Sequence, residues 1–167
     1  HSFSKGYFSE KFQKERIADS HYDVFPLESI EDFVVFCDQH KHLAGLNVTI
    51  PYKEKIIPFL DELNDEAAAI GAVNTIKFIE GKKIGYNTDC HGFEMSLKLL
   101  LKPHHTDALI LGTGGASKAV EYVLKKLDIS FQYVSRNKSA NTINYDELDE
   151  HIIHHSKLII NSTPLGM

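Results

Sequence analysis

The stretch ALILGTGGASKAVEYVL, residues 108–124, decides the fold of the second half of the chain. Its apolar start is typical of a buried strand, and the apolar residues after Ser117 recur at helical spacing. Glycines between a strand and a helix form the context that a dinucleotide-binding turn requires. Gly112 permits a tight turn, Gly114 lets a pyrophosphate approach the backbone, and the N–H groups at the helix start favour an anion. We therefore expect a phosphate-binding turn at 112–117, with Ser117 where Gly or Ala is usual.

The residues around this turn repeat the same alternation of strand and helix. Continuous apolar runs that alternate with helices predict a parallel sheet that is covered on both faces, the doubly wound α/β class. The predicted elements are a strand at 107–112, a helix at 116–127, a strand at 131–137, a helix at 145–155 and a strand at 157–163.

The end of the second of these strands bears on the type of dinucleotide. A site that prefers NAD places Asp or Glu there for the ribose hydroxyls. This chain has no carboxylate at that place and instead reads Ser135-Arg136-Asn137-Lys138. Two cations suit a 2′-phosphate, so the sequence favours NADP. The alternative is an exposed basic turn that follows a purely structural glycine loop.

The first half alternates less regularly. Ser4 is placed to cap a helix that ends near Ile17, and Ser29 begins a second helix whose inner face holds Ile30, Phe33, Val34 and Cys37. Pro51 is expected at the first position of a third helix, with Ile56, Ile57 and Leu60 inside. The remaining predictions are strands at 21–27 and 43–50, a β-hairpin at 72–89, and a helix that Asp89 caps and Pro103 ends.

Bulk composition excludes several classes of function. A net charge of −5 over 167 residues argues against a nucleic-acid binder, which needs clustered Lys and Arg. No apolar run reaches the roughly 20 residues that span a bilayer, and no signal peptide begins the sequence, so we expect a cytoplasmic protein without membrane contact. Cys37 and Cys90 are far apart in sequence, which favours free thiols. The histidine pairs His104–His105 and His151–His155 lack an HExxH pattern, so no metal is expected.

Six motifs occur in order along the chain: HSFS (1–4), LNVTIPYK (46–53), IGAVNT (70–75), GYNTD (85–89), GTGGAS (112–117) and NSTPLGM (161–167). Together they resemble the shikimate dehydrogenase family over essentially the whole segment. The resemblance implies a mixed, mostly parallel α/β substrate domain followed by a Rossmann-like domain, with the active site between them. We place the two domains at 1–102 and 103–167. It also implies reduction of 3-dehydroshikimate to shikimate with NADPH, in the chorismate route to aromatic amino acids, by a monomer or homodimer.

The resemblance assigns roles to residues that the motifs contain. It implies that Lys53 and Asp89 form the catalytic pair, and that NADP provides the hydride. The implied substrate-binding residues are Ser2, Ser4, Asn47, Thr49 and Asn74, and the implied cofactor-binding residues are Gly112, Gly114, Gly115, Ala116, Ser117, Ser135, Arg136, Asn137, Lys138 and Thr163.

The chain departs from the family pattern in three ways. Where the family has NRTxxR, this chain has residues 135–140 with Ala140 in place of the second arginine, and Cys90 follows Asp89. The family's first strand would precede His1 and the rest of the Rossmann half would follow Met167, and no initiator Met begins the chain. We therefore expect a piece of a longer protein that is impaired on its own. Two alternatives stay open: a quinate/shikimate dehydrogenase with relaxed cofactor choice, and a non-catalytic nucleotide-binding regulatory module.

Overall fold

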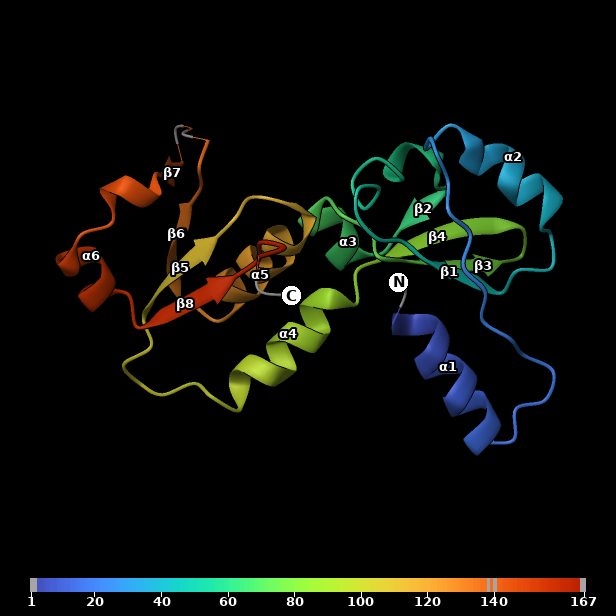
Figure 1. Ribbon diagram of the computed structural model, residues 1–167, viewed down its shortest axis with the longest axis horizontal. Helices are drawn as coiled ribbons and strands as arrows, with labels where there is room; N and C mark the ends of the chain where they lie inside the picture. Colours follow the sequence, from blue (N-terminus) through green and yellow to red (C-terminus); the bar gives the residue numbers. More distant parts are fainter. Residues whose placement is uncertain (1–2, 138, 140, 166–167) are drawn as a thin grey trace. The chain divides into compact units, whose positions relative to one another are not determined.

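The computed structural model describes residues 3–137, 139 and 141–165. The chain divides into two compact units, His1–Gln39 and His40–Met167 (Figure 1). The predicted boundary near residue 103 separates two sheets within the second unit, and the assignment of 1–102 and 103–167 as domains stays a prediction. Among the described residues, no helix has the length and apolar character needed to cross a membrane.

The first unit contains two helices, α1 (Phe3–Lys14) and α2 (Asp32–Gln39). Helix α1 begins before Ser4, so the prediction that Ser4 caps it is wrong. It also ends before Ile17, because Arg16 adopts a positive φ of 58° that an α-helix cannot contain. Ring packing holds the helix to the segment that follows, with the ring centroids of Phe8 and Tyr22 5.0 Å apart.

Residues 21–27 do not form the strand that the sequence predicted. No ladder partner pairs with them among the described residues, and an extended run without a neighbouring strand is not a strand. In α2 the prediction is partly correct, because Ile30 and Phe33 are buried. Val34 is exposed instead of buried, and Phe36 takes its place, since the buried stripe follows a spacing of three residues.

The second unit begins with a mixed four-stranded sheet in the order β1-β3-β4-β2. Strand β1 (Gly45–Asn47), shorter than the predicted 43–50, pairs antiparallel with β3 (Thr75–Ile79). The hairpin of β3 and β4 (Lys82–Tyr86) is confirmed, and its two loop residues, Glu80 and Gly81, have positive φ as a tight hairpin turn requires. Among the described strands, parallel pairing in this sheet is confined to β2 (Glu62–Leu63) with β4.

The helix predicted from Pro51 does not form. The segment makes turns and one 3-10 helix, η1 (Ile57–Phe59), because Pro58 lacks an N–H and its ring clashes with the preceding helical turn. Ile56 is nonetheless buried as predicted, with 1% exposed. A helix that the sequence reading missed follows as α3 (Asp65–Ile70), which Asn64 caps by accepting a hydrogen bond from Ala67 N at 3.0 Å.

The second sheet confirms the predicted doubly wound arrangement. Its order is β7-β6-β5-β8 and every pairing is parallel. The strands are β5 (Asp107–Leu111), β6 (Ser130–Val134), β7 (Thr142–Ile143) and β8 (Leu158–Asn161). The predicted helix at 145–155 is divided into η2 (Tyr145–Glu147) and α6 (Glu150–His155), because Asn144 and Asp149 each cap a new turn.

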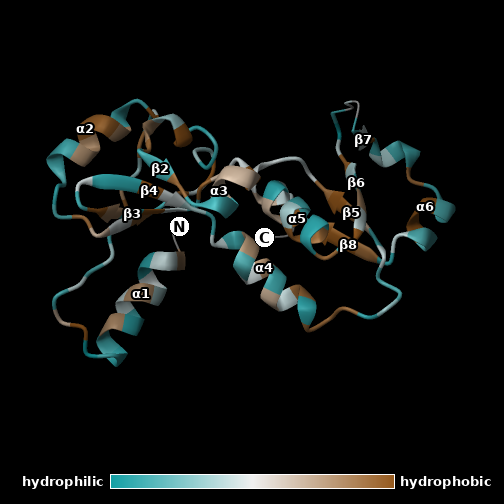
Figure 2. Ribbon diagram, turned by 180° about the vertical axis from the view of Figure 1, so that it is seen from behind, coloured by the Kyte–Doolittle hydropathy of each residue, from teal (hydrophilic) through white to brown (hydrophobic). Residues whose placement is uncertain are grey.

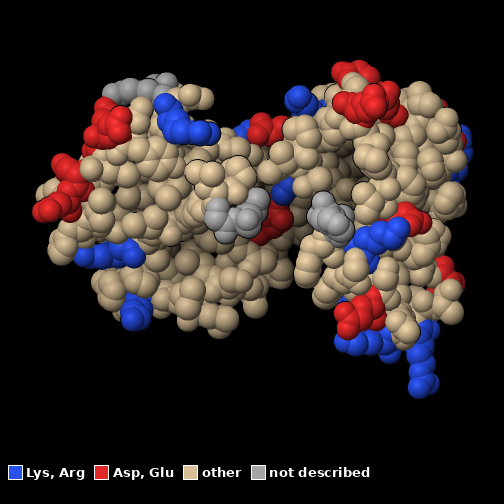
Figure 3. Space-filling model, viewed as in Figure 1, with Lys and Arg blue, Asp and Glu red and all other residues tan. Residues whose placement is uncertain are grey.

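Two helices pack together beside the second sheet. Helix α4 (Asp89–Lys98) packs on α5 (Gly115–Lys126), and both contribute to a buried cluster with β5. Figure 2 shows that β5 and β8 are the most hydrophobic strands, as a sheet between layers requires. Figure 3 shows Lys and Arg interspersed with Asp and Glu over the face that it displays. The cluster joins α4, which follows the first sheet in the chain, to the second sheet.

Candidate active site

A lysine and an aspartate that lie 36 residues apart in sequence meet in the second unit. Lys53 Nζ donates to Asp89 Oδ2 at 2.7 Å. The Lys53 side chain is 17% exposed and that of Asp89 is 39% exposed, so the pair lies at the edge of solvent. A charge-assisted hydrogen bond of this length fixes the direction of the ammonium group.

Asp89 reaches Lys53 because it does not cap α4, which corrects the sequence prediction. The buried side chain of Asn87 performs that task, since its Oδ1 accepts from Cys90 N at 3.2 Å. Its Nδ2 donates to Ala72 O at 2.9 Å, so both ends of the amide are used. The carboxylate of Asp89, at the first helical position, is thereby left for the site.

Asn74 holds the other oxygen of this carboxylate. Its Nδ2 donates to Asp89 Oδ1 at 2.7 Å, and its Oδ1 accepts from the backbone N–H of Thr88 at 2.8 Å. Because a backbone N–H can only donate, the oxygen of the amide must face Thr88 and the NH₂ group must face Asp89. The sequence reading missed Thr88, although it lies within the GYNTD motif.

Backbone hydrogen bonds fix the backbone positions of Lys53 and Asn74. Val73 N donates to Lys53 O at 2.7 Å, which ties the turn after Pro51 to the segment that leads into β3. Asn74 N donates to Tyr86 O at 3.0 Å, and Val48 N donates to Asn74 O at 2.8 Å. Backbone hydrogen bonds therefore hold the segments of Lys53 and Asn74 next to the first sheet, while Asp89 is held at the start of α4.

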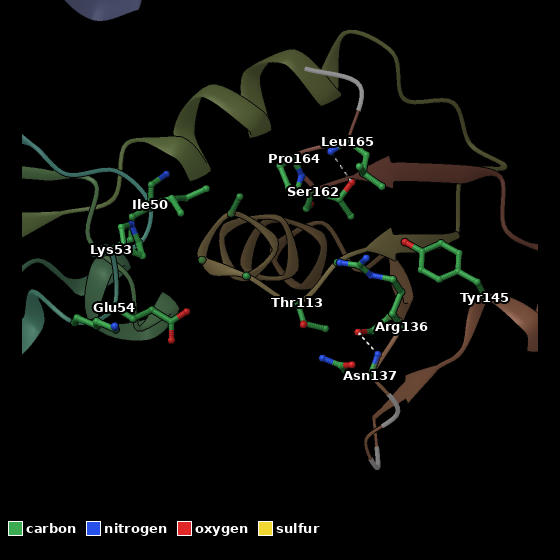
Figure 4. Close-up of a pocket in the computed structure, with 18 residues that line it drawn as sticks. Ile50, Lys53, Glu54, Thr113, Arg136, Asn137, Tyr145, Ser162, Pro164 and Leu165 are labelled. Atoms are coloured by element: carbon green, nitrogen blue, oxygen red, sulfur yellow. Dashed lines mark hydrogen bonds between the residues drawn. The ribbon is translucent and has the colours of Figure 1, made fainter. Parts of the chain in front are cut away.

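A cavity of about 910 Å³ lies beside the lysine and extends to the second sheet (Figure 4). Such a volume is in the range of small-molecule and cofactor sites. The lining comes from the turn after β1, the glycine turn, the end of β6, η2 and the segment after β8. Its residues are Ile50, Pro51, Lys53, Glu54, Lys55, Gly112, Thr113, Gly114, Gly115, Ala116, Ser135, Arg136, Asn137, Tyr145, Ser162, Thr163, Pro164 and Leu165.

Along the glycine turn, residues 112–116, the cavity is lined mainly by backbone atoms that a ligand can approach closely. Gly112 has a φ of 100°, and a Cβ there would lie 3.0 Å from Thr163 Cγ2. A Cβ on Gly114 would meet nothing within 4 Å, so the backbone there is open to a ligand. No side chain of the described residues caps α5. Ser117 N donates to Gly114 O at 3.0 Å, so the N–H groups of Gly115 and Ala116 are the ones that face an anion at this helix start. The turn fits the pyrophosphate of a dinucleotide.

Ser117 does not line the cavity, unlike the other predicted cofactor-binding residues of the glycine turn. It is fully buried, and its Oγ donates to Gly114 O at 2.6 Å. The hydroxyl shapes the turn from behind and does not line the cavity. Packing of α5 at this position is thus close, although the sequence has neither Gly nor Ala there. Behind it, burial and the nearby Glu121 carboxylate raise the pKa of Tyr133.

The segment after β8 closes the other side of the turn. Thr163 N and Oγ1 both donate to Asn161 Oδ1, at 3.0 and 2.7 Å. Asn161 Nδ2 donates to Leu165 O at 2.9 Å. The asparagine therefore folds the NSTPL stretch back on itself and holds Thr163 at the cavity.

The remaining predicted residues are not all gathered here. Asn47 lies opposite Thr75 in the β1–β3 register, and Thr49 follows it; both are exposed. Ser4 lies in α1, within the first unit. Ser2 and Lys138 are outside the described residues, as is Ala140.

Two further features lie next to the predicted site. Glu54, the neighbour of Lys53, accepts a hydrogen bond from Lys118 Nζ of α5 at 2.5 Å. Cys90, whose role the sequence left open, is a buried core residue, and its Sγ donates to Asn87 O at 3.1 Å. Burial raises the pKa of its thiol, as expected for a structural cysteine.

Comparison with known proteins points to one family. Residues 1–76 match the model of the shikimate dehydrogenase substrate binding domain. A curated relative, the shikimate dehydrogenase (NADP(+)) of Staphylococcus epidermidis strain RP62A, is 36% identical over the whole chain. The chain spans 65% of that relative's length.

Solved structures agree with this finding. Shikimate dehydrogenase 1 from Peptoclostridium difficile is 36% identical and has a TM-score of 0.82, with 100% of this chain and 64% of that chain covered. The enzyme from Thermus thermophilus, solved in complex with NADP(H) and shikimate, is 28% identical with a TM-score of 0.79. There the match covers 98% of this chain and 64% of the other.

Proposed function

We propose that the chain is part of a shikimate dehydrogenase, and that it carries the catalytic pair and the dinucleotide turn of an oxidoreductase that interconverts 3-dehydroshikimate and shikimate with NADP(H). One observation carries the proposal. Lys53, held at 2.7 Å by Asp89, lines the same cavity as Gly112–Ala116. A proton donor and a phosphate-binding turn on one cavity are what reduction of a ketone by a dinucleotide needs.

The substrate and the cofactor follow from the relatives. The Staphylococcus relative is named for shikimate and NADP(+), and the Thermus structure contains both ligands. In this chain, Asn47 ends β1, Thr49 lies two residues beyond it and Asn74 precedes β3. We propose all three as binding groups for the substrate's carboxylate end and hydroxyls. Ser2 and Ser4 stay proposed ligands of the carboxylate by family resemblance.

The proposed chemistry assigns one task to each residue of the pair. NADPH would supply the hydride that forms the new C–H bond at the ketone carbon. The ammonium of Lys53 donates a proton to the ketone oxygen, so that the charge developing there is neutralised. Asp89 directs the ammonium by its hydrogen bond, and Asn74 keeps the carboxylate in place. In the reverse direction Lys53, as the free amine, takes the proton from the hydroxyl.

The cofactor side is proposed from the lining residues. Backbone N–H groups of the glycine turn would bind the pyrophosphate, and Ser135, Arg136 and Asn137 lie at the end of β6, where a 2′-phosphate belongs. Thr163 completes the wall opposite the turn. Lys138, outside the described residues, stays a proposed second cation for the phosphate.

The test is turnover by the natural protein that contains this chain. NADPH absorbance is followed with 3-dehydroshikimate for the wild type, Lys53→Ala and Lys77→Ala. Lys77 is an exposed lysine of β3 and does not line the cavity, so it controls for loss of a positive charge. We expect Lys53→Ala to lower kcat by about 100-fold or more, the typical contribution of a general acid, with a small change in KM. Wild-type rates in Lys53→Ala would remove this lysine from the mechanism, and no turnover by the wild type would overturn the proposed function.

A further inference from the structure

The end of the cavity away from Lys53 contains the planar guanidinium group of Arg136 and the aromatic ring of Tyr145. Arg136 and Asn137 follow β6, and Tyr145 begins η2; all three line the cavity. Figure 4 shows the Tyr145 ring and the Arg136 side chain on the same side of it. The acidic side chain in the described lining, Glu54, lies on the opposite side. This end therefore suits a ligand with a planar group and a negative charge.

Strand register explains why the tyrosine and the arginine lie together. Val134 of β6 pairs with Ile143 of β7, and Ser135 N donates to Ile143 O at 3.0 Å. Arg136 and Tyr145 each lie two residues beyond that pair, at the carboxyl ends of neighbouring parallel strands. Open α/β sheets bind their ligands at this edge.

The backbone of Tyr145 is fixed by the capped turn that it begins. Asn144 N donates to Glu147 Oε2 at 2.7 Å, which forms one half of a capping box. Asn144 Nδ2 donates to Arg136 O at 3.4 Å, a longer contact that joins the turn to the loop after β6. Tyr145 as a residue is 37% exposed and lines the cavity, so part of it is accessible to a ligand there.

We propose that Tyr145 is the side chain on which the adenine of the bound dinucleotide stacks, beside Arg136 at the 2′-phosphate. The inference rests on the proposed function and names a residue that the glycine motif does not reveal. Aromatic rings stack on any base through their π faces, and the planar guanidinium can also pack on a ring. Tyr145 would thus contribute to affinity for adenine whether or not a 2′-phosphate is present, whereas Arg136 would read the phosphate.

Two small probes separate these roles in the natural protein: adenosine 5′-monophosphate, and adenosine 2′,5′-bisphosphate. Binding is measured by calorimetry for the wild type, Tyr145→Ala, Tyr145→Phe and Arg136→Gln. We expect Tyr145→Ala to weaken both probes by a similar factor of about ten, within the range measured for base–aromatic stacking. Tyr145→Phe keeps the ring and should stay within about twofold of the wild type. Arg136→Gln should weaken the bisphosphate and leave the monophosphate unchanged.

The outcomes distinguish this inference from the proposed function. Unchanged binding of both probes to Tyr145→Ala, in a protein that turns over 3-dehydroshikimate, overturns the role of Tyr145 alone. Loss of the bisphosphate only would overturn it as well, because it would place the phenol at the phosphate. A wild type that binds neither probe contradicts the inference and the proposed cofactor together. Equal losses for both probes, with Tyr145→Phe near wild type, support stacking even if turnover is absent.

Discussion

Gly112 shows how much of the site depends on single backbone positions. Its φ of 100° lies in a region that side chains rarely adopt, and its missing Cβ leaves room for Thr163. Gly114, two residues on, has a φ of −84° and open space around it. The same motif thus contains one glycine that the backbone conformation requires, and one that we propose is needed for a ligand to approach.

The stability of two alanine variants separates these roles. Gly112→Ala should lower the free energy of unfolding by about 1–3 kcal/mol, because a residue with a Cβ is strained at that φ. Gly114→Ala, the matched control, should change it by less than about 0.5 kcal/mol. Urea unfolding followed by circular dichroism measures both. Equal losses would mean that the strain at Gly112 does not limit stability.

At this scale the sequence predicted the contact between two residues but assigned the cap of α4 to the wrong one. Lys53 and Asp89 meet, as the family resemblance required. The prediction that Asp89 caps α4 failed because Asn87, two residues earlier, makes that bond, and either side chain satisfies the pattern of a cap in sequence. Only the hydrogen bonds of the folded chain distinguish them.

Helices α4 and α5 are joined by a carboxylate that two lysines share. Glu94 Oε1 accepts from Lys98 Nζ at 2.6 Å within α4, and Glu94 Oε2 accepts from Lys126 Nζ of α5 at 2.8 Å. The Glu94 side chain is 11% exposed. Hydrogen bonds from Lys126 and Lys98 lower the pKa of Glu94 from its usual 4.5 to about 2.

This shift makes the helix pair sensitive to acid in a defined window. A carboxylate with a lowered pKa stabilises the fold fully above its ordinary pKa, and loses that contribution as the pH falls towards its folded value. Stability from Glu94 should therefore decline between about pH 5 and pH 2. In Glu94→Gln, the free energy of unfolding should fall less steeply over this window, measured by urea titration at several pH values.

The control for this prediction is Glu10→Gln. Glu10 pairs with Lys14 at 2.6 Å within α1, and its side chain is 64% exposed, so solvent screens the pair. Its pH profile should follow the wild type. A Glu94→Gln profile as steep as that of the wild type would show that other groups account for acid sensitivity.

Among the elements, periodic segments were predictable and proline-rich ones were not. The five predicted elements of the second sheet region have counterparts, because buried strands and an amphipathic α5 leave long patterns. The helix from Pro51 failed at Pro58, and α3 was missed because six residues carry too little periodicity to detect. The signals in the sequence that could have revealed α3 were Asn64 as its N-cap and Gly71 just after its last residue.

As a whole, the 167-residue chain leaves one apolar row on α4 and the residues after it open to solvent. Met95 is 57% exposed, Leu99 87% and Leu100 69%. Neighbouring exposed apolar side chains favour association and dye binding. We expect the chain by itself to bind a hydrophobic dye and to associate as its concentration rises, in line with the predicted impairment of the isolated piece.

Charged substitutions at this row test the expectation. Leu99→Lys with Leu100→Lys should lower dye fluorescence and shift sedimentation towards a single copy. Ile153→Lys on α6, an apolar side chain 47% exposed, is the control and should have little effect. Dye binding that is the same in all three proteins would mean that the apolar row does not govern association. Cytoplasmic location and a monomer or homodimer stay predictions.

The ion pair between Glu54 and Lys118 has a consequence for how the proposed site does its work. Glu54 adjoins Lys53 in the chain, and Lys118 belongs to the first turns of α5, so the ion pair joins the loop of the proposed proton donor to the helix that we propose binds the phosphates. We expect this ion pair to help keep the two proposed binding regions at a fixed spacing, so that bound reactants lose less rotational freedom on meeting. Natural variants that lack this ion pair should therefore have a lower kcat with an unchanged KM.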